Sequence, residues 1–533
     1  MKRTALALTL IFALSVSTMV GVTTVHFGEA QSGTNVTGII VSDTTWTLAN
    51  SPYNLTGNVL VNNGAILYIQ AGTIVNLGSY YIEVNGTLQA IGYGANSITF
   101  NGGQITFTQY STNWNESSGT GCIIQNANLT SDLTLSNSAK ISSNSIYGKI
   151  TTNDYTNEYA ESIISNNIIE GGVVLEGQDL VLNNTILNQG ITIWSTNATV
   201  SGNIISGSSA GITDYTDFWD NSNPNAWNNC TALIQSNLIL NNSYGIELKE
   251  QQGSKPNSPV ILNNTITNNT VGIYITWIGL AAPQPEILNN NIYSNSNYNI
   301  EISVPTDENA TYNWWGTNGT QPISQTIYDY YDDFNLGIVT YVPFLTAPNT
   351  DAPTYVNVST GVGGSINPSG IIRVNYGGNQ SFNIKPNTGY YTTEVYVNGT
   401  SVGAVSSYFV QNINGATTIS ATFAPNPTPT PTPSPTPSPT TSPTPTPSPT
   451  ASPTPAPTAP STSTATSAPH PSPTASPKAT PTSLATTQST PSPTRTVPEF
   501  PTLIIPPVLA GIILLSIVFV RKRILKNRSL KSF

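Results

Sequence analysis

Three aspartates lie close together in the chain, Asp214, Asp217 and Asp220, and they are the strongest candidates for chemistry. Carboxylate oxygens are the ligands that Ca²⁺ prefers, and two carboxylates at a suitable distance can act as acid and nucleophile in glycoside cleavage. Acidic residues also commonly do no more than solvate a surface loop. We favour solvation over catalysis. The sequence indicates no cofactor other than a Ca²⁺ ion that these three aspartates would bind.

Aromatic side chains accompany the aspartates and offer rings that can stack on sugars. Three of them lie in the same stretch, which follows Ile212 as an insertion, and a fourth lies in a milder insertion at residues 277–285. We expect the two insertions to project from one side of the molecule and to form a shared rim. The candidate ligand-binding residues are therefore Tyr215, Trp219, Trp227 and Trp277.

Other catalytic chemistries are excluded by residue types that the chain lacks. No Arg lies between Arg3 and Arg373, which excludes an elimination that depends on an Arg base. The two His residues are His26, in an expected leader, and His470, in a Pro-rich segment. The folded part therefore lacks the commonest acid-base group and transition-metal ligand. We expect a protein without enzymatic activity; if it is an enzyme, it is a glycoside hydrolase that uses Asp residues.

The net charge is −10, and only 8% of the residues are charged. Nucleic acid is excluded as a partner, because binding to phosphates requires clustered Lys and Arg. The polar surface must come from Asn, Ser and Thr, and many Asn lie in the triplet that accepts N-linked glycan. The candidate glycosylation sites are Asn35, Asn54, Asn85, Asn183, Asn197, Asn241, Asn263, Asn309 and Asn398.

Four copies of one short pattern must position these residues. The copies start at Asn203, Asn237, Asn264 and Asn291, and each has Gly or Asn eight residues later. Their spacing is 34, 27 and 27 residues, which is typical of stacked coils with one loop of variable length. The Asn and Gly positions suit turns in the left-handed region. We also expect equivalent Asn side chains to form a hydrogen-bonded ladder along the stack.

Apolar residues alternate in these copies, as at Ile246 and Leu248, which predicts strands with one buried face. In the first copy Asp214 takes the place of Leu248. A carboxylate in the dry interior would cost several kcal/mol, so we expect the strand to end before Asp214 and the insertion to begin there. The residues that we expect to meet inside the stack are Ile246, Ile273 and Ile300.

These repeats resemble those of right-handed parallel β-helix proteins of the pectin-lyase-like type, and they are similar to the repeats of the NosD-like family. The resemblance implies an all-β solenoid over residues 31–350. We assign residues 35–60, with Trp46, to its first cap, and expect Trp314 and Trp315 to pack in its second. The copper association of NosD does not carry over, because the folded part has no His.

Two further segments follow the solenoid. Short alternating runs with Gly-Gly and Asn-Gly turns predict a small all-β module over residues 351–424. The module resembles the divergent InlB-type B-repeat of surface proteins, which implies a spacer or interaction domain. Residues 425–498 are rich in Pro, Thr and Ser, which is typical of an extended stalk without a core.

Both ends carry patterns of export and anchoring. Residues 1–30 have a basic start, an apolar run and a small-residue cleavage site, as secretory signal peptides do. Residues 503–520 form an apolar run long enough to span a bilayer, and the basic tail after it is predicted to lie in the cytoplasm. Together with Pro498-Glu499-Phe500, the segment 499–533 resembles the PEF-type sorting signal that archaeosortases read in archaea.

These features predict a glycosylated protein on the extracellular face of the cell membrane, held there by a C-terminal transmembrane helix. We expect it to mediate adhesion or to recognise a polysaccharide or cell-surface glycan. The alternatives are a carboxylate-dependent glycosidase that degrades polysaccharide and a structural component of the cell envelope. Export also permits a disulfide between Cys122 and Cys230, although two Cys so far apart in a stacked fold need not meet.

Overall fold

The computed structural model describes residues 33–153, 161–194, 196–216, 231–250, 257–277 and 282–428. Strands dominate these residues, and the one α-helix among them is α1 (Thr320–Ser324). Most strands belong to long parallel sheets, so the expected all-β fold class is confirmed and the arrangement is consistent with a β-helix solenoid. No helix in this part of the chain is long and apolar enough to cross a membrane; residues 503–520 lie outside it.

Eleven short strands form one parallel sheet, to which each coil contributes a single strand. These strands are β2 (Thr44–Trp46), β4 (Ile66–Ile69), β6 (Thr87–Ile91), β8 (Ile123–Gln125), β11 (Lys140–Ser142), β14 (Ile163–Ser165), β17 (Leu180–Leu182), β20 (Thr199–Ser201), β23 (Leu233–Gln235), β26 (Val260–Leu262) and β29 (Glu286–Leu288).

The first four coils complete their circuit with one long strand each, and these long strands pair in parallel. They are β1 (Thr34–Ile40), β3 (Tyr53–Val61), β5 (Ile74–Val84) and β7 (Ile98–Phe107). After β7 the long strand divides at a turn into two short strands, because β7 pairs with both β9 and β10, defined below. We call the two halves the first limb and the second limb.

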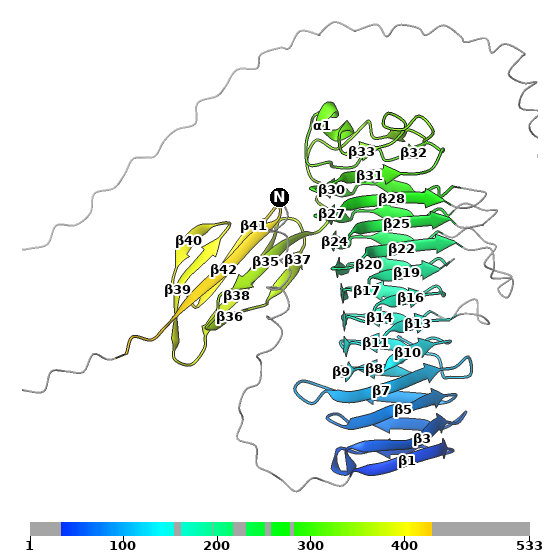
Figure 1. Ribbon diagram of the computed structural model, residues 1–533. Helices are drawn as coiled ribbons and strands as arrows, with labels where there is room; N and C mark the ends of the chain where they lie inside the picture. The colour runs from blue at the N-terminus through cyan, green and yellow to red at the C-terminus, as the bar shows by residue number, and fades with distance from the viewer. Residues whose placement is uncertain are drawn as a thin grey trace, which may run out of the picture. The chain divides into compact units, whose positions relative to one another are not determined.

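The first limb consists of β9 (Ala127–Leu129), β12 (Ser145–Ile146), β15 (Ile168–Ile169), β18 (Thr185–Leu187), β21 (Ile204–Ser206), β24 (Leu238–Leu240), β27 (Thr265–Thr267) and β30 (Asn291–Tyr293). The second limb consists of β10 (Asp132–Leu135), β13 (Ile150–Thr152), β16 (Val173–Leu175), β19 (Ile191–Trp194), β22 (Ala210–Thr216), β25 (Tyr244–Glu250), β28 (Val271–Trp277), β31 (Tyr298–Ile302) and β33 (Ile327–Tyr328). Figure 1 shows the coils stacked in chain order from β1 to β33.

Stacking places equivalent residues of successive coils in register. Ile212, Ile246, Ile273, Ile300 and Ile327 follow one another across neighbouring second-limb strands, and all are buried. Full burial of each such side chain contributes about 1.5–3 kcal/mol. The prediction that Ile246, Ile273 and Ile300 meet inside the stack is confirmed.

A ladder of buried amides runs along the corner between the eleven-stranded sheet and the first limb. In each step the side-chain Nδ2 of one Asn donates to Oδ1 of the next at 2.9–3.0 Å. The members are Asn144, Asn167, Asn184, Asn203, Asn237, Asn264, Asn290 and Asn313. The predicted ladder is therefore present, although the fourth copy enters it through Asn290. Asn291 pairs with Thr265 instead.

The turns use Asn and Gly differently from the prediction. The left-handed residue is the one before each ladder Asn, as at Asn183, Ser236 and Asn263, whose φ angles are 54–55°. Gly245 and Gly272 are needed for close packing: a Cβ on Gly245 would lie 2.5 Å from the carbonyl oxygen of Gly272. The Gly positions thus permit close contact between coils rather than a left-handed turn.

The two ends of the solenoid differ. Residues 34–61 form regular coils, because β1 pairs with β3 along most of its length, so they do not form the separate cap that we assigned to them. Trp46 is buried and stacks on Tyr53 at 4.9 Å. At the other end β32 (Glu308–Asn309) and α1 lie in the chain between β31 and β33, and β34 (Val339–Thr340) follows β33. The buried Trp315 contacts Tyr341 edge-on.

The small module has two sheets around its own core. One sheet has the order β37 (Gly370–Val374), β35 (Thr354–Thr360), β42 (Thr417–Pro425), β39 (Tyr390–Val397) and β40 (Thr400–Gly403); the other has β36 (Gly364–Asn367), β38 (Gly378–Pro386) and β41 (Ser407–Ile413). Phe382, Val395 and Ile419 are among its buried residues. Tyr355 of the module also packs with Leu238 and Leu240 of β24, in the same compact unit of the chain.

Candidate functional site

The structure places Asp214 inside the solenoid. It lies in β22, which continues to Thr216, and it is in register with Ile193 on one side and Leu248 on the other. Its side chain is 0% exposed. The prediction that the strand ends before Asp214 is therefore wrong, and this carboxyl does not face solvent. Asp217, Asp220, Trp219, Trp227 and Cys230 lie outside the described residues.

Asp214 can occupy a buried position because its carboxyl can stay protonated and therefore uncharged. Burial raises the pKa of Asp214 to about 7, well above its ordinary value of 3.8, although the Asn257 amide beside it lowers the pKa slightly. A protonated carboxyl is far cheaper to bury than a carboxylate. The large cost applies to the charged form, whereas the neutral form fits a core position.

The other predicted residues within the described part are separated from each other. Tyr215 faces outward from β22, and its ring lies 5.5 Å from that of Trp194 in an edge-on contact. Trp277 is paired with Glu250, and it is partly buried against the hydrophobic core. The structure thus leaves Tyr215 on the outer surface and turns Trp277 toward the interior.

A continuous outward column runs along the second limb and the long strands before it. Each coil contributes one residue to it, and the register of neighbouring strands defines its members. They are Glu83, Thr106, Thr134, Thr151, Val174, Thr192, Thr213, Glu247, Tyr274, Glu301 and Tyr328. Threonine hydroxyls therefore line the middle of the column, interrupted by Val174, and tyrosines and glutamates occupy its end.

Aromatic rings gather on the last coils of this face. Tyr244 stacks on Tyr274 at 5.0 Å, and Tyr298 lies 5.3 Å from Tyr328. A separate edge-on pair, Trp194 and Tyr215, lies on the earlier strands β19 and β22, two residues beyond the column members Thr192 and Thr213. We call the three ring pairs together the aromatic stripe: Trp194, Tyr215, Tyr244, Tyr274, Tyr298 and Tyr328. Such rings offer rigid apolar area and, in Tyr, a hydroxyl for hydrogen bonding. This combination suits sugar rings, which have apolar C–H faces and polar edges.

Two glutamates accompany the stripe. Glu247 forms an ion pair with Lys249 at 2.8 Å, and Glu301 lies two coils further along the column. Burial raises the pKa of Glu301. The pKa of Tyr244 is raised by burial and then by Tyr274, Glu301 and Glu247, which shows that these groups share one patch.

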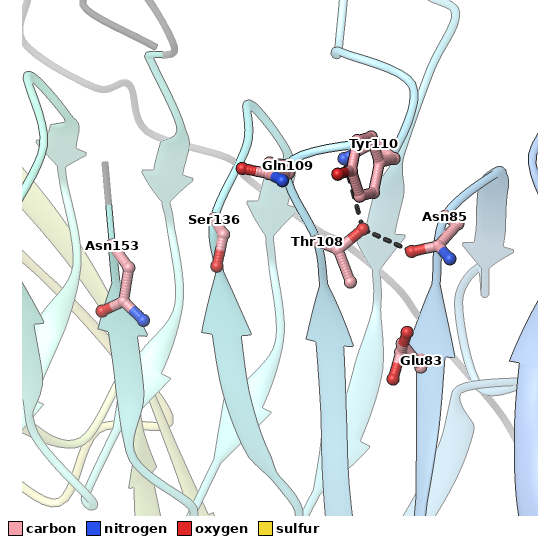
Figure 2. A pocket seen from close by; sticks show the side chains of 7 residues that line it. All are labelled: Glu83, Asn85, Thr108, Gln109, Tyr110, Ser136 and Asn153. Atoms are coloured by element: carbon pink, nitrogen blue, oxygen red, sulfur yellow. Dashed lines mark hydrogen bonds between the residues drawn. The ribbon is translucent and has the colours of Figure 1, made fainter. Parts of the chain in front are cut away.

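A polar hollow of about 290 Å³ lies on the same sheet, at the ends of β5, β7, β10 and β13. Figure 2 shows its side chains gathered where these strands end: Glu83, Asn85, Thr108, Gln109, Tyr110, Ser136 and Asn153. Thr108 donates a hydrogen bond to Asn85, and Tyr110 is 63% exposed beside them. The amides, hydroxyls and single carboxylate of the hollow can form hydrogen bonds with a hydroxylated ligand. Glycoside hydrolysis usually requires two carboxyl groups, and the lining of the hollow contains only Glu83.

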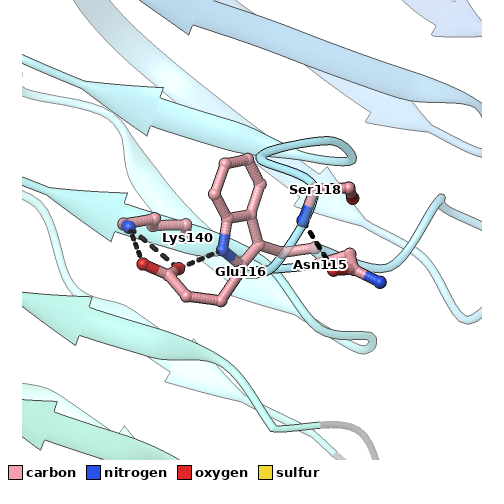
Figure 3. A network of polar contacts seen from close by, with 5 residues as sticks. Asn115, Glu116, Ser118 and Lys140 are labelled. Atoms are coloured by element: carbon pink, nitrogen blue, oxygen red, sulfur yellow. Dashed lines mark hydrogen bonds and ion pairs between the residues drawn. The ribbon is translucent and has the colours of Figure 1, made fainter.

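A second polar network has a structural role. Lys140 of β11 contacts Glu116 at 2.7 Å and lies 5.1 Å from the ring centroid of Trp114, whose indole nitrogen also donates to Glu116 at 2.6 Å. Figure 3 shows Glu116 and Lys140 joined between the loop and the sheet. The hydrogen bonds from Lys140 and Trp114 lower the pKa of Glu116. The network holds the loop on the eleven-stranded sheet.

The remaining predicted residues are placed as follows. Cys122 is a buried free thiol, and burial raises its pKa to about 11. Among the candidate glycosylation sites, Asn54, Asn85 and Asn263 are half-buried and accept hydrogen bonds through their side chains. The exposed ones are Asn35, Asn183, Asn197, Asn241, Asn309 and Asn398.

Sequence reasoning missed the aromatic stripe, although a signal was present. Tyr274 alternates with the buried Ile273 and Ile275, so its outward direction could be predicted. Comparison with known proteins finds no matching family model, no similar curated protein and no similar solved structure.

Proposed function

We propose that this protein recognises polysaccharide at the cell surface, through the outer face of the second limb. The observation that carries the proposal is the aromatic stripe, of which Tyr274 and Tyr328 belong to the outward column. A repeating row of hydrogen-bonding groups and rings offers equivalent contacts to successive units of a repeating polymer. The polar hollow at Glu83 extends the same face toward the first coils.

The chain outside the described residues supports the location. We propose a secreted, glycosylated, right-handed parallel β-helix of the pectin-lyase-like type, displayed on a Pro/Thr/Ser-rich stalk. The basic tail after the apolar run at residues 503–520 supports a C-terminal anchor in the cell membrane, and Pro498-Glu499-Phe500 supports a PEF-type sorting signal. In this arrangement the rod is held away from the membrane, where it can meet extracellular glycans.

Binding of the full-length protein to a panel of immobilised neutral and acidic polysaccharides tests the proposal. We expect saturable binding to at least one of them, and we expect Tyr274→Ala to weaken it about tenfold by removing one ring of the stripe. Tyr93→Ala is the matched control, because Tyr93 is 67% exposed and lies outside the stripe. Equal binding by Tyr274→Ala and the wild type, or no binding to any polysaccharide, would contradict the proposal.

A second candidate function is glycoside hydrolysis by Glu247 and Glu301. Their strands are two coils apart, roughly 10 Å at about 4.8 Å per strand, and inverting glycosidases hold their carboxyl groups about 6.5–9.5 Å apart. Glu247 is paired with Lys249, whereas burial raises the pKa of Glu301. Different environments for two carboxyl groups are what an acid and a base require.

This alternative predicts that the protein releases reducing ends from the polysaccharide that it binds. Glu301→Gln is expected to abolish release while binding is retained, and Glu286→Gln, on the eleven-stranded sheet, is expected to leave it unchanged. The glycosidase is excluded if the wild-type protein releases no reducing ends from a polysaccharide that it binds.

A further inference from the structure

A polar cluster lies inside the solenoid, where other second-limb positions are aliphatic. It consists of Asp214, Thr216, Glu250 and Asn257, whose exposed fractions are 0%, 6%, 1% and 0%. Asp214 and Thr216 point inward from β22, and Glu250 is in register with Thr216 on β25. The cluster therefore spans two neighbouring coils.

The contacts within the cluster leave oxygen atoms unused. Glu250 Oε2 accepts hydrogen bonds from Thr216 Oγ1 at 2.9 Å and from the Asn257 backbone N–H at 3.1 Å. The Asn257 side chain lies beside the Asp214 carboxyl. Yet neither Asp214 oxygen, and neither polar atom of the Asn257 amide, has a hydrogen bond of normal geometry. A buried polar group without a partner costs about 1–3 kcal/mol, so two such side chains facing each other require an explanation.

Strand β22 contains no basic residue that could form an ion pair with Asp214. Lys249 neighbours Glu250 on β25, but it faces outward and pairs with Glu247 at 2.8 Å. The atoms without a hydrogen bond include both carboxyl oxygens of Asp214 and the amide oxygen of Asn257. Oxygen atoms of these kinds are the ligands that Ca²⁺ prefers. Among the described residues no three acidic, His or Cys side chains converge, so a metal here would draw on the amide and hydroxyl as well.

We propose that Asp214, Glu250 and Asn257 bind a Ca²⁺ ion inside the solenoid. The ion would use the carboxyl oxygens of Asp214, the amide oxygen of Asn257 and an oxygen of Glu250. Thr216, backbone carbonyls or water would complete the six to eight oxygens that Ca²⁺ takes. The site differs from the predicted one at Asp214, Asp217 and Asp220, and it does not depend on the proposed glycan recognition.

The test is thermal unfolding of the full-length protein, treated with EGTA and then titrated with CaCl₂ to about 1 mM at about pH 8. We expect Ca²⁺ to raise the Tm by ~3 °C or more. Asp214→Leu, which matches its aliphatic neighbours, and Asp214→Asn, which preserves shape, are both expected to abolish the rise. Asp217→Asn and Glu301→Gln are controls that should retain it.

Two results would overturn the proposal. One is a wild-type Tm that does not change with Ca²⁺ and is accompanied by no saturable ⁴⁵Ca²⁺ binding. The other is a Ca²⁺ response that persists in both Asp214 variants, or that Asp217→Asn abolishes while they retain it. Two Asp214 variants are used so that, if one of them does not fold, the other still shows whether Asp214 is needed for the Ca²⁺ response.

Discussion

At the residue scale, Asp214 is expected to control how the stability of the protein depends on pH. Burial raises its pKa from 3.8 to about 7. The folded state then binds this proton more tightly than the unfolded state does. The contribution to stability is therefore fully present below about pH 4 and is lost progressively as the pH rises toward 7.

We predict that Asp214→Asn removes most of this dependence. Between about pH 5 and pH 8, in EGTA, the wild-type free energy of unfolding should fall by roughly 2–3 kcal/mol through this group, and that of the variant should fall less. Denaturant unfolding measures both. Glu308, whose pKa burial raises to about 8, adds a slope of the same sign to both proteins. Identical slopes would show that Asp214 is not the titrating group.

Asp214 also shows why a residue-level rule failed. A buried carboxylate does carry a large cost, and from that cost we predicted that the strand ends before Asp214. The structure keeps the strand to Thr216, and the carboxyl responds by a change in pKa. Neither Asn257 nor Glu250 is near Asp214 in the sequence, so this polar surrounding could not be predicted from the repeat.

At the scale of the elements, the Asn ladder ties each coil to the next. Asn237 is 0% exposed, and its Nδ2 donates to Asn264 Oδ1 at 3.0 Å and to the Val200 carbonyl at 2.9 Å. Its Oδ1 accepts from the backbone N–H of Asn203 at 2.9 Å. Each corner along the ladder from Asn144 to Asn313 thus depends on one side chain for several buried backbone groups.

We predict that Asn237→Ala destabilises the protein by about 3 kcal/mol or more, because it orphans buried groups on both adjoining coils. Asn128→Ala is the control: Asn128 is exposed on β9, and its loss should cost under about 0.5 kcal/mol. Denaturant unfolding of the two variants gives the comparison. Similar costs would show that the ladder contributes no special stability.

The elements were largely predictable because each coil repeats the same physical demands. Inward Ile residues and a corner Asn recur at fixed positions, so the stack of Ile246, Ile273 and Ile300 followed from alternation alone. The fourth copy was misaligned by one residue, because Asn290 and Asn291 are adjacent and either could be the corner. Only three-dimensional register distinguishes them.

At the scale of the whole molecule, the surface is built from hydroxyls, amides and rings rather than charges. Only 8% of the residues are charged, and the net charge is −10. A protein with this charge does not attract negatively charged phosphate polymers over long distances. A neutral polar face with tyrosines suits sugars better. The candidate site was predicted in the loop at Asp214, whereas the described residues gather their aromatic rings on the sheet face. Outward tyrosines between buried Ile residues look like ordinary alternation, and only stacking brings them together.

Oxidative footprinting of aromatic side chains tests whether the aromatic stripe contacts polysaccharide. The full-length protein is labelled with and without the polysaccharide that it binds best. We predict reduced labelling of Trp194, Tyr244, Tyr274, Tyr298 and Tyr328, with unchanged labelling of the exposed Tyr93 and Tyr147. Unchanged labelling of the stripe, with protection confined to Tyr93, Tyr147 or the small module, would contradict polysaccharide recognition by the aromatic stripe.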